Sequence, residues 1–277
     1  SHADQNSFAI LKGGLALAIP SGYYGPSYGM PHHDRWTRQT KANNSILVNG
    51  AGQVDRSAKA QGRISDFQHQ AATTYVCGDA AAAYGGKLST FFRHVVFLRP
   101  GLIAMVDELE APEPAEYRWL LHGFEQMQLD ETAGTVISFR KGATLTVKLD
   151  CDQGFGFSQT DQFDTPYNEG NPPEYWEDKA DQWHFTARTL ERARRVRIAA
   201  SMVVRGVNQT LETEWMAYFG WRGVRVSSDE GDGEIWMQVT AGLKPPYGGI
   251  PLSAMMAAHW QPKSGPEERL VVESKGR

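Results

Sequence analysis

Short runs of β-branched and aromatic residues recur through this chain, and turn-forming residues separate them. Residues 91–98 (FFRHVVFL) stop at Pro100-Gly101 and a second run starts at Leu102, which is typical of a hairpin. Residues 135–140 and 143–149 flank a short Lys-Gly turn in the same way. Many short strands at near-regular spacing predict an all-β fold, a large antiparallel β-sandwich with few short helices.

The remaining segments fit the same architecture. Helical periodicity is scarce, and residues 68–84 offer the best place for a short helix, centred on 80–83. The polar, proline-containing segment 161–181 is expected to be an excursion at the rim of the sheets. We see no internal repeat and no interdomain linker, so we expect one domain spanning 1–277. Further strands are expected at 117–122, 183–189, 195–204, 215–221, 234–240, 254–260 and 270–273.

Composition narrows the class of protein. Hydrophobic residues make up 41% of the 277-residue chain, which is enough to bury a core. The net charge of −4 argues against nucleic-acid or membrane-surface binding, and no apolar stretch approaches the roughly 20 residues of a membrane span. Cys77 and Cys151 are expected to be buried free thiols, and a zinc ribbon is excluded. The arginine-rich run 188–197 is interpreted as the solvated face of a strand.

Polar groups that can move protons or hold a carboxylate are concentrated in the first fifty residues. His2, His32 and His33 titrate near neutral pH, and Arg35 and Arg38 offer donor forks suited to a carboxylate. Tyr23, Tyr24 and Tyr28 lie among glycines, where a backbone can approach a ligand closely, and Trp36 and Trp176 could stack on a sugar ring. Together these residues suit proton abstraction from an acidic sugar, with its carboxylate neutralised.

Structural roles compete with these functional ones. A histidine in a strand is more often a hydrogen-bonding structural residue than a catalyst. Arg38 could simply form an ion pair with Asp107 or Glu108, and glycine-tyrosine loops are often only turns. The histidines for which we favour the structural role are His69, His94, His122, His184 and His259.

The run 2–8 (HADQNSF) resembles the opening of the β-sheet domain in heparinase II/III-like polysaccharide lyases. The same family is suggested by 18–24 (AIPSGYY), 38–46 (RQTKANNSI), 92–98, 106–109 and 117–122. The resemblance covers at least residues 1–125. Exolytic oligoalginate lyases look most similar, with heparin lyases more distant.

The resemblance implies a two-part active site. In that family an α/α toroid joins the β-sandwich, supplies the catalytic tyrosine and another histidine, and leaves the active site in the cleft between the two parts. This chain contains no toroid and opens within the motif, so we expect the C-terminal sandwich of a longer lyase, inactive or nearly so alone. The histidine that the sandwich supplies falls on His2.

The same resemblance assigns the site residues. His2 is expected to be catalytic, neutralising the carboxylate or assisting proton transfer, while Gln5 and Asn6 orient it or bind sugar. Tyr24, His33 and Arg35 are expected to shape a substrate subsite, and Arg38 to reach a carboxylate.

The resemblance also bears on metals. Zinc-containing members carry ligands at positions that are His2, Pro20 and Asn43 here, and proline and asparagine are unsuitable, so we expect no zinc and no cofactor. The adjacent His32, His33 and Asp34 could seed another metal site, but we do not expect one.

The sequence therefore predicts the sandwich part of a lyase that cleaves a uronate-containing polysaccharide by β-elimination, with alginate first and heparin or heparan next. The partners would be the acidic saccharide and the toroid, with no nucleic acid and no membrane. The location would be periplasmic or secreted, or cytoplasmic if imported oligomers are the substrate. A non-catalytic carbohydrate-binding module, or a purely structural module, stays open as the alternative.

Overall fold

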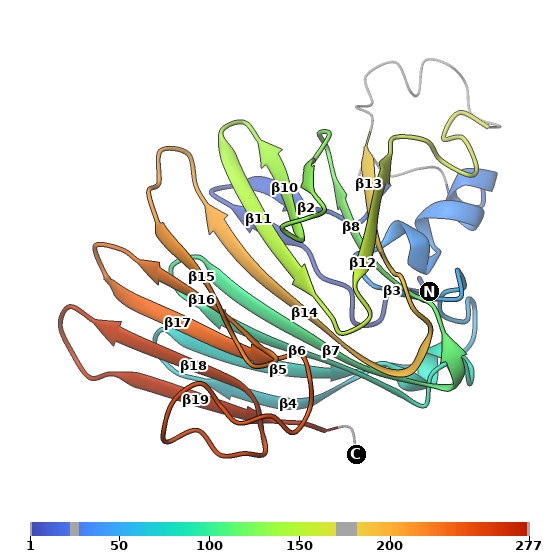
Figure 1. The fold of residues 1–277 in the computed structure, drawn as a ribbon. Coiled ribbons are helices and arrows are strands. Elements are labelled where there is room, and N and C mark those ends of the chain that lie inside the picture. Colours follow the sequence, from blue (N-terminus) through green and yellow to red (C-terminus); the bar gives the residue numbers. More distant parts are fainter. Residues whose placement is uncertain (1, 23–27, 170–181, 276–277) are drawn as a thin grey trace.

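Four antiparallel sheets make up the computed structural model, which describes residues 2–22, 28–169 and 182–275 (Figure 1). The largest sheet has eight strands, and their spatial order places the long β7 and β14 at its centre. In that order the strands are β4 (Arg63–His69), β5 (Thr73–Asp79), β6 (Thr90–Leu98), β7 (Leu102–Ala115), β14 (Ala193–Arg205), β11 (Ala143–Asp150), β10 (Thr135–Arg140) and β9 (Gln128–Asp130).

Two smaller sheets cover the opposite faces of the large one. The four-stranded sheet lies on one face and consists of β12 (Phe155–Thr160), β13 (Trp183–Thr189), β8 (Tyr117–Gly123) and β3 (Ile46–Val48). The five-stranded sheet lies on the other, with β15 (Glu212–Tyr218), β16 (Trp221–Ser227), β17 (Gly231–Gln238), β18 (Ala254–Pro262) and β19 (Glu268–Glu273). A hairpin of β1 (Ile10–Lys12) and β2 (Leu15–Ala18) completes the set.

The large sheet is buried on both faces because its central strands are apolar on both sides. In β7, Leu102, Ala104 and Val106 pack toward the five-stranded sheet, while Met105 and Leu109 pack toward the four-stranded sheet. Each face forms its own hydrophobic core. The two cores explain why residues 102–106 of β7 and 198–204 of β14 are apolar, or nearly so, at successive positions rather than alternating.

The predicted all-β sandwich and most of its predicted strands are confirmed, including the hairpins at Pro100 and Lys141. Cys77 and Cys151 are buried free thiols, as expected. None of the helices in the described chain is long and apolar enough to cross a membrane.

One of the predicted strands is wrong. Residues 215–221 are not one strand, since the chain turns between β15 and β16 at Phe219 and Gly220, both with positive φ. The short helix expected within 68–84 forms where it was centred, as the 3-10 helix Ala81–Tyr84 (η3), while residues 73–79 of that range form strand β5. β5 lies between two other strands of the large sheet, so strand pairing outweighed the local helical pattern.

The arginine-rich run is only partly the solvated face that the sequence predicted. Arg194 and Arg195 are exposed, but the Arg197 side chain is only 14% exposed. It bonds both Glu108 and Gln238 between the large and the five-stranded sheets.

A buried ion pair joins β6 to β7. Arg93 and Asp107 are register partners, and the arginine Nε and Nη2 donate to the two carboxylate oxygens at 2.6 and 2.7 Å. The Arg93 Nη1 donates to the carbonyl oxygens of Asn6 and Asn44 at 2.5 and 2.9 Å. The side chains of the pair are 4% and 0% exposed, so neither charge can be solvated if the other is removed.

Arg93→Met should therefore lower the free energy of unfolding by about 3–5 kcal/mol, since Asp107 is left buried without a partner. Urea unfolding monitored by tryptophan fluorescence measures this. The control Arg195→Met removes an ion pair between an exposed arginine and a half-buried glutamate and should cost less than about 1 kcal/mol. Equal losses in the free energy of unfolding would show that the buried pair stabilises the protein no more than the solvent-accessible one.

Candidate active site

The opening segment, residues 2–9, has no regular secondary structure, yet its backbone is held at nearly every step. Ala3 donates its N–H to the Arg38 carbonyl at 2.8 Å, and the Thr40 hydroxyl donates to the Ala3 carbonyl at 2.9 Å. The Gln53 side-chain amide bonds both backbone groups of Gln5, at 3.0 and 2.8 Å. These bonds replace the ladder of a strand and keep the segment in one conformation.

Asn44 completes this support. Its amide nitrogen donates to the Phe8 carbonyl at 2.7 Å and to the Ile19 carbonyl at 3.1 Å. Its oxygen accepts the backbone N–H of His122, which belongs to β8, at 2.8 Å. The opening segment is therefore connected through one buried side chain to the four-stranded sheet, and through Arg93 to the large sheet.

His2 stands at the start of this supported segment and lines a surface pocket of about 500 Å³. Its ring lies 5.8 Å, centroid to centroid, from the ring of His33, in an edge-on arrangement. Tyr28 is 87% exposed and its ring lies 4.9 Å from that of His33. Other residues that line the pocket are Asp4, Ser7, Phe8, Ala9, Pro20, Ser21, Gly22, Thr37 and Asn43.

The protonation of His33 follows from its surroundings. The backbone N–H of Gly29 lies 3.2 Å from Nδ1, and the Asp34 carboxylate lies 3.3 Å from the same nitrogen, so both polar contacts of the ring fall on Nδ1. Burial lowers the pKa of His33, and the nearby Asp34 opposes this only in part. Asp34 is itself held by Arg56 at 2.6 Å, which lowers the pKa of its carboxyl. His33 thus adds an uncharged ring to the pocket at neutral pH.

The sequence-predicted site residues do not all gather here. Of the described ones, His2 and His33 line the pocket, whereas Gln5, Asn6, Arg35 and Arg38 do not. Asn6 has a φ of 58° and donates from its amide to the Gly78 carbonyl at 3.0 Å, which is a structural role. Tyr24, like Tyr23 and Trp176, lies outside the described residues.

Arg38 and Trp36 are buried in the fold, and Arg35 lies at a different surface. Arg38 is buried and bonds Asp55 at 3.0 Å and Asp34 at 3.4 Å, so the suggested pairing with Asp107 or Glu108 is wrong. Arg35 is exposed and borders a separate hollow. Trp36 is buried against His184 and Phe163, so the suggestion that it stacks on a sugar is also wrong.

The heparinase II/III-like C-terminal family model matches residues 1–216. The chain belongs to this family. The match contains the opening segment, both histidines of the pocket and the strands that support them. It ends within β15, before most of the five-stranded sheet. A search of curated proteins finds no match.

Solved structures of heparinase II/III-like proteins share the fold. Heparan sulfate lyase HepC from Pedobacter heparinus is 12% identical, with a TM-score of 0.63. The alignment covers 100% of this chain and 38% of the HepC chain. The heparinase III-BT4657 gene product is 10% identical, with a TM-score of 0.62. The alignment covers 99% of this chain and 37% of the BT4657 chain. The chain thus spans little more than a third of the length of these proteins.

The three positions to which the sequence resemblance assigned zinc ligands lie together at the pocket. His2, Pro20 and Asn43 all line it, although they are far apart in sequence. The Asn43 amide donates to the Gln39 carbonyl at 2.9 Å, and proline offers no ligand atom. Within the described ranges, no group of three or more His, Cys, Asp or Glu side chains is arranged to hold a metal ion.

Beside the pocket, a buried aromatic layer fixes the segment that follows β12. His32 Nδ1 donates to the Thr165 carbonyl at 2.6 Å, and Phe163 packs edge-on against His32 and His184. His122 and His184 are cross-strand neighbours whose Nδ1 atoms lie 3.1 Å apart, while both Nε2 atoms are buried without a hydrogen-bond partner. Both histidines are structural, as the sequence predicted.

This histidine pair should make stability depend on pH. Burial lowers the pKa of His184 to about 4 and that of His122 well below its usual value. The unfolded chain takes up protons near pH 6.5 and the folded protein does not, so stability is lost as the pH falls from about 6.5 to about 4.

Urea unfolding at about pH 7 and about pH 4 tests this dependence. His184 alone should account for a loss of about 3 kcal/mol, and in His184→Phe that part of the loss should disappear. Parallel pH profiles for the protein and the variant would contradict the assignment.

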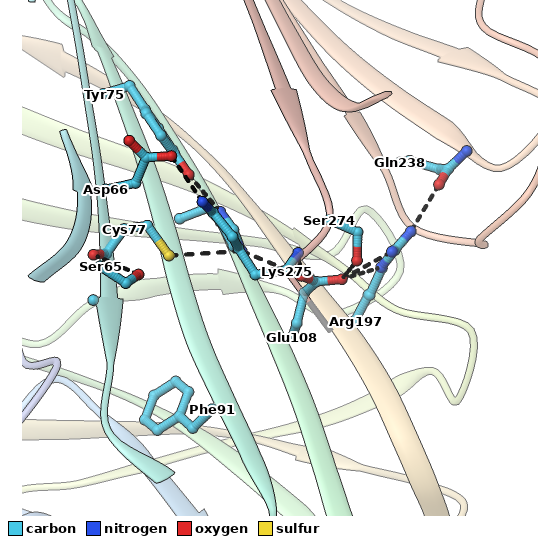
Figure 2. A network of polar contacts seen from close by, with 12 residues as sticks. Ser65, Asp66, Tyr75, Cys77, Phe91, Glu108, Arg197, Gln238, Ser274 and Lys275 are labelled. Atoms are coloured by element: carbon cyan, nitrogen blue, oxygen red, sulfur yellow. Dashed lines mark hydrogen bonds and ion pairs between the residues drawn. The ribbon is translucent and has the colours of Figure 1, made fainter. Parts of the chain in front are cut away.

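A second polar cluster lies between the large and the five-stranded sheets (Figure 2). Glu108 is at its centre and accepts from Arg197 at 2.8 Å, from the Lys275 backbone at 2.9 Å and from the Ser274 hydroxyl. His94 Nε2 lies 3.2 Å from Glu108 and 3.9 Å from the Cys77 sulfur. Burial alone lowers the pKa of His94, but its contacts with Cys77 and Glu108 outweigh this and raise it.

This cluster has the residue types of a cysteine-histidine-carboxylate triad but not the arrangement. In such a triad the two ring nitrogens face different partners, whereas here Cys77 and Glu108 share one nitrogen and Tyr75 occupies the other at 2.9 Å. Cys77 and His94 are fully buried. The cluster therefore fastens the C-terminal segment and the five-stranded sheet to the large sheet.

Proposed function

We propose that this chain is the sandwich part of a polysaccharide lyase that cleaves a uronate-containing polysaccharide by β-elimination. The supporting observation is the exposed His2 at a pocket of about 500 Å³, held there by a backbone that buried side chains fix in place. Family membership supports the same reaction class. The structural neighbours named as heparan sulfate lyases make heparan sulfate one substrate to test, and the opening motif makes oligoalginate the other.

The chemistry requires neutralisation of the uronate carboxylate, because negative charge builds on it as the C5 proton leaves. His2 is proposed to contact that carboxylate or to assist the proton transfer near it. His33 is proposed to hydrogen-bond the saccharide through Nε2, since Gly29 and Asp34 both lie against Nδ1. Gln5, Asn6 and Arg38 are proposed to hold the opening segment that carries His2 in place, rather than to touch the sugar.

The tyrosine base and the second histidine of the reaction are proposed to come from an α/α toroid facing this pocket. The chain alone should then bind uronate oligosaccharides but form no unsaturated product, which ultraviolet absorbance detects. Product formed by the chain alone and lost in His2→Ala would contradict the need for a toroid.

The effect of a His2 substitution on oligosaccharide binding distinguishes a lyase domain from a carbohydrate-binding or structural module. NMR titration with an alginate or a heparan sulfate tetrasaccharide should shift the ring signals of His2 and His33. His2→Ala should weaken binding about tenfold, the size expected for losing one charge-assisted hydrogen bond. His259→Ala, which alters a partly exposed histidine on β18, is the matched control and should change nothing.

The two oligosaccharides also decide the substrate, because the tighter binder identifies the polymer. Unchanged binding in His2→Ala would instead favour a carbohydrate-binding or structural module.

A further inference from the structure

We propose that a second site for an acidic saccharide lies in the groove between the large sheet and the edge of the five-stranded sheet. The groove, of about 330 Å³, is lined by residues of β11 and β14 on one side and of β15 and β16 on the other. Only the idea that the saccharide is a substrate of the proposed lyase depends on the proposed function. The site itself rests on Lys148, Asp150, Ser201, Trp215 and Arg222, which line the groove.

The groove exists because the two sheets differ in width. β16 packs over β14, β17 over β7 and β18 over β6, so the edge strand β15 lies over β11. The large sheet continues beyond that edge to β10 and β9, which the five-stranded sheet does not cover. In Figure 1 this side, marked by β15 and β11, lies across the molecule from the N-terminus.

The pleat of β11 determines which side chains face the groove. Leu145, Val147 and Leu149 point into the core under the four-stranded sheet. The intervening Lys148 and Asp150 therefore face the other side, where both line the groove. On the neighbouring strand β14, Ser201 lies on the groove floor and is 3% exposed.

The charge of the groove favours an anion. Arg222 pairs with Asp150 and donates from Nη1 to the Trp221 carbonyl at 3.0 Å, so that pair is neutral. The Lys148 ammonium lies 5.7 Å from the Trp215 ring centroid and forms no ion pair with any described carboxylate. The charged residues that line the groove thus sum to one positive charge, carried by Lys148.

Trp215 supplies apolar indole surface at the wall of the groove, with the Lys148 ammonium over its ring. It lies on the edge strand and is only partly buried, packed at the margin of the core between the two sheets. An indole beside an ammonium and hydroxyl groups matches a pyranose ring that carries a carboxylate or sulfate. Nucleic acid is a poor fit, because the chain has a net charge of −4 and the groove only one excess cation.

The test is an NMR titration of the whole chain with an alginate tetrasaccharide, a heparan sulfate tetrasaccharide and the uncharged cellotetraose at low ionic strength. The Trp215 indole N–H signal, assigned by its loss in Trp215→Phe, should shift with the two acidic probes and not with cellotetraose. Lys148→Met should weaken this binding about tenfold and reduce its dependence on salt.

Two control variants separate this site from the His2 pocket. Lys263→Met removes one positive charge just beyond the end of β18, next to the end of β17 that lies away from the groove. This variant should leave the Trp215 response unchanged. His2→Ala should also leave it unchanged, even if the proposed function fails. An unmoved Trp215 signal, an equal response to cellotetraose, or wild-type affinity in Lys148→Met would overturn the second site.

Discussion

The buried ion pair between Arg93 and Asp107 is the interaction on which the candidate site depends most. It forms within the large sheet, yet the third nitrogen of the guanidinium reaches out of the sheet to the carbonyls of Asn6 and Asn44. One charged side chain therefore binds two neighbouring strands, the opening segment and the residue that anchors that segment to β8. Because the pair is almost fully buried, the arrangement is stable only when all of its donors are used.

This arrangement explains how a segment without secondary structure can present a reactive histidine. The carbonyls of Ala3, Gln5, Asn6 and Phe8 accept from Thr40, Gln53, Arg93 and Asn44. Side chains from far along the chain thus do for residues 2–8 what a neighbouring strand does in a sheet. A site built this way is rigid in the backbone and exposed at its tip, which suits a surface that completes its cleft with another part of a protein.

Local sequence patterns predicted many of the strands and two of the hairpins, since strand periodicity and turn residues are encoded over a few positions. They also predicted structural roles for His122 and His184. They failed where tertiary contacts dominate. Trp36 has the composition of a sugar-stacking residue but packs under Phe163, and Arg38 pairs with Asp34 and Asp55 rather than with Asp107 or Glu108.

The candidate site divides in the same way. The opening motif pointed to His2, and the structure adds that His33 lies beside it, because η1 (His33–Thr37) brings the two rings together. The roles of Gln53 and Asn44 as supports had no signal in the sequence, since each depends on a contact more than thirty positions away. The groove at Trp215 was equally invisible, because it arises from how far one sheet extends past another.

Hydrogen exchange of the opening segment tests the central claim most directly. The amides of Ala3 and Gln5 donate to the Arg38 carbonyl and to Gln53 Oε1, so they should exchange as slowly as amides in the outer strands of the sheets. Replacing Gln53 by leucine should speed exchange at Gln5 and leave the core of β7 protected. Exchange at Ala3 and Gln5 as fast as in an unstructured peptide would contradict the account, because His2 would then have no fixed position.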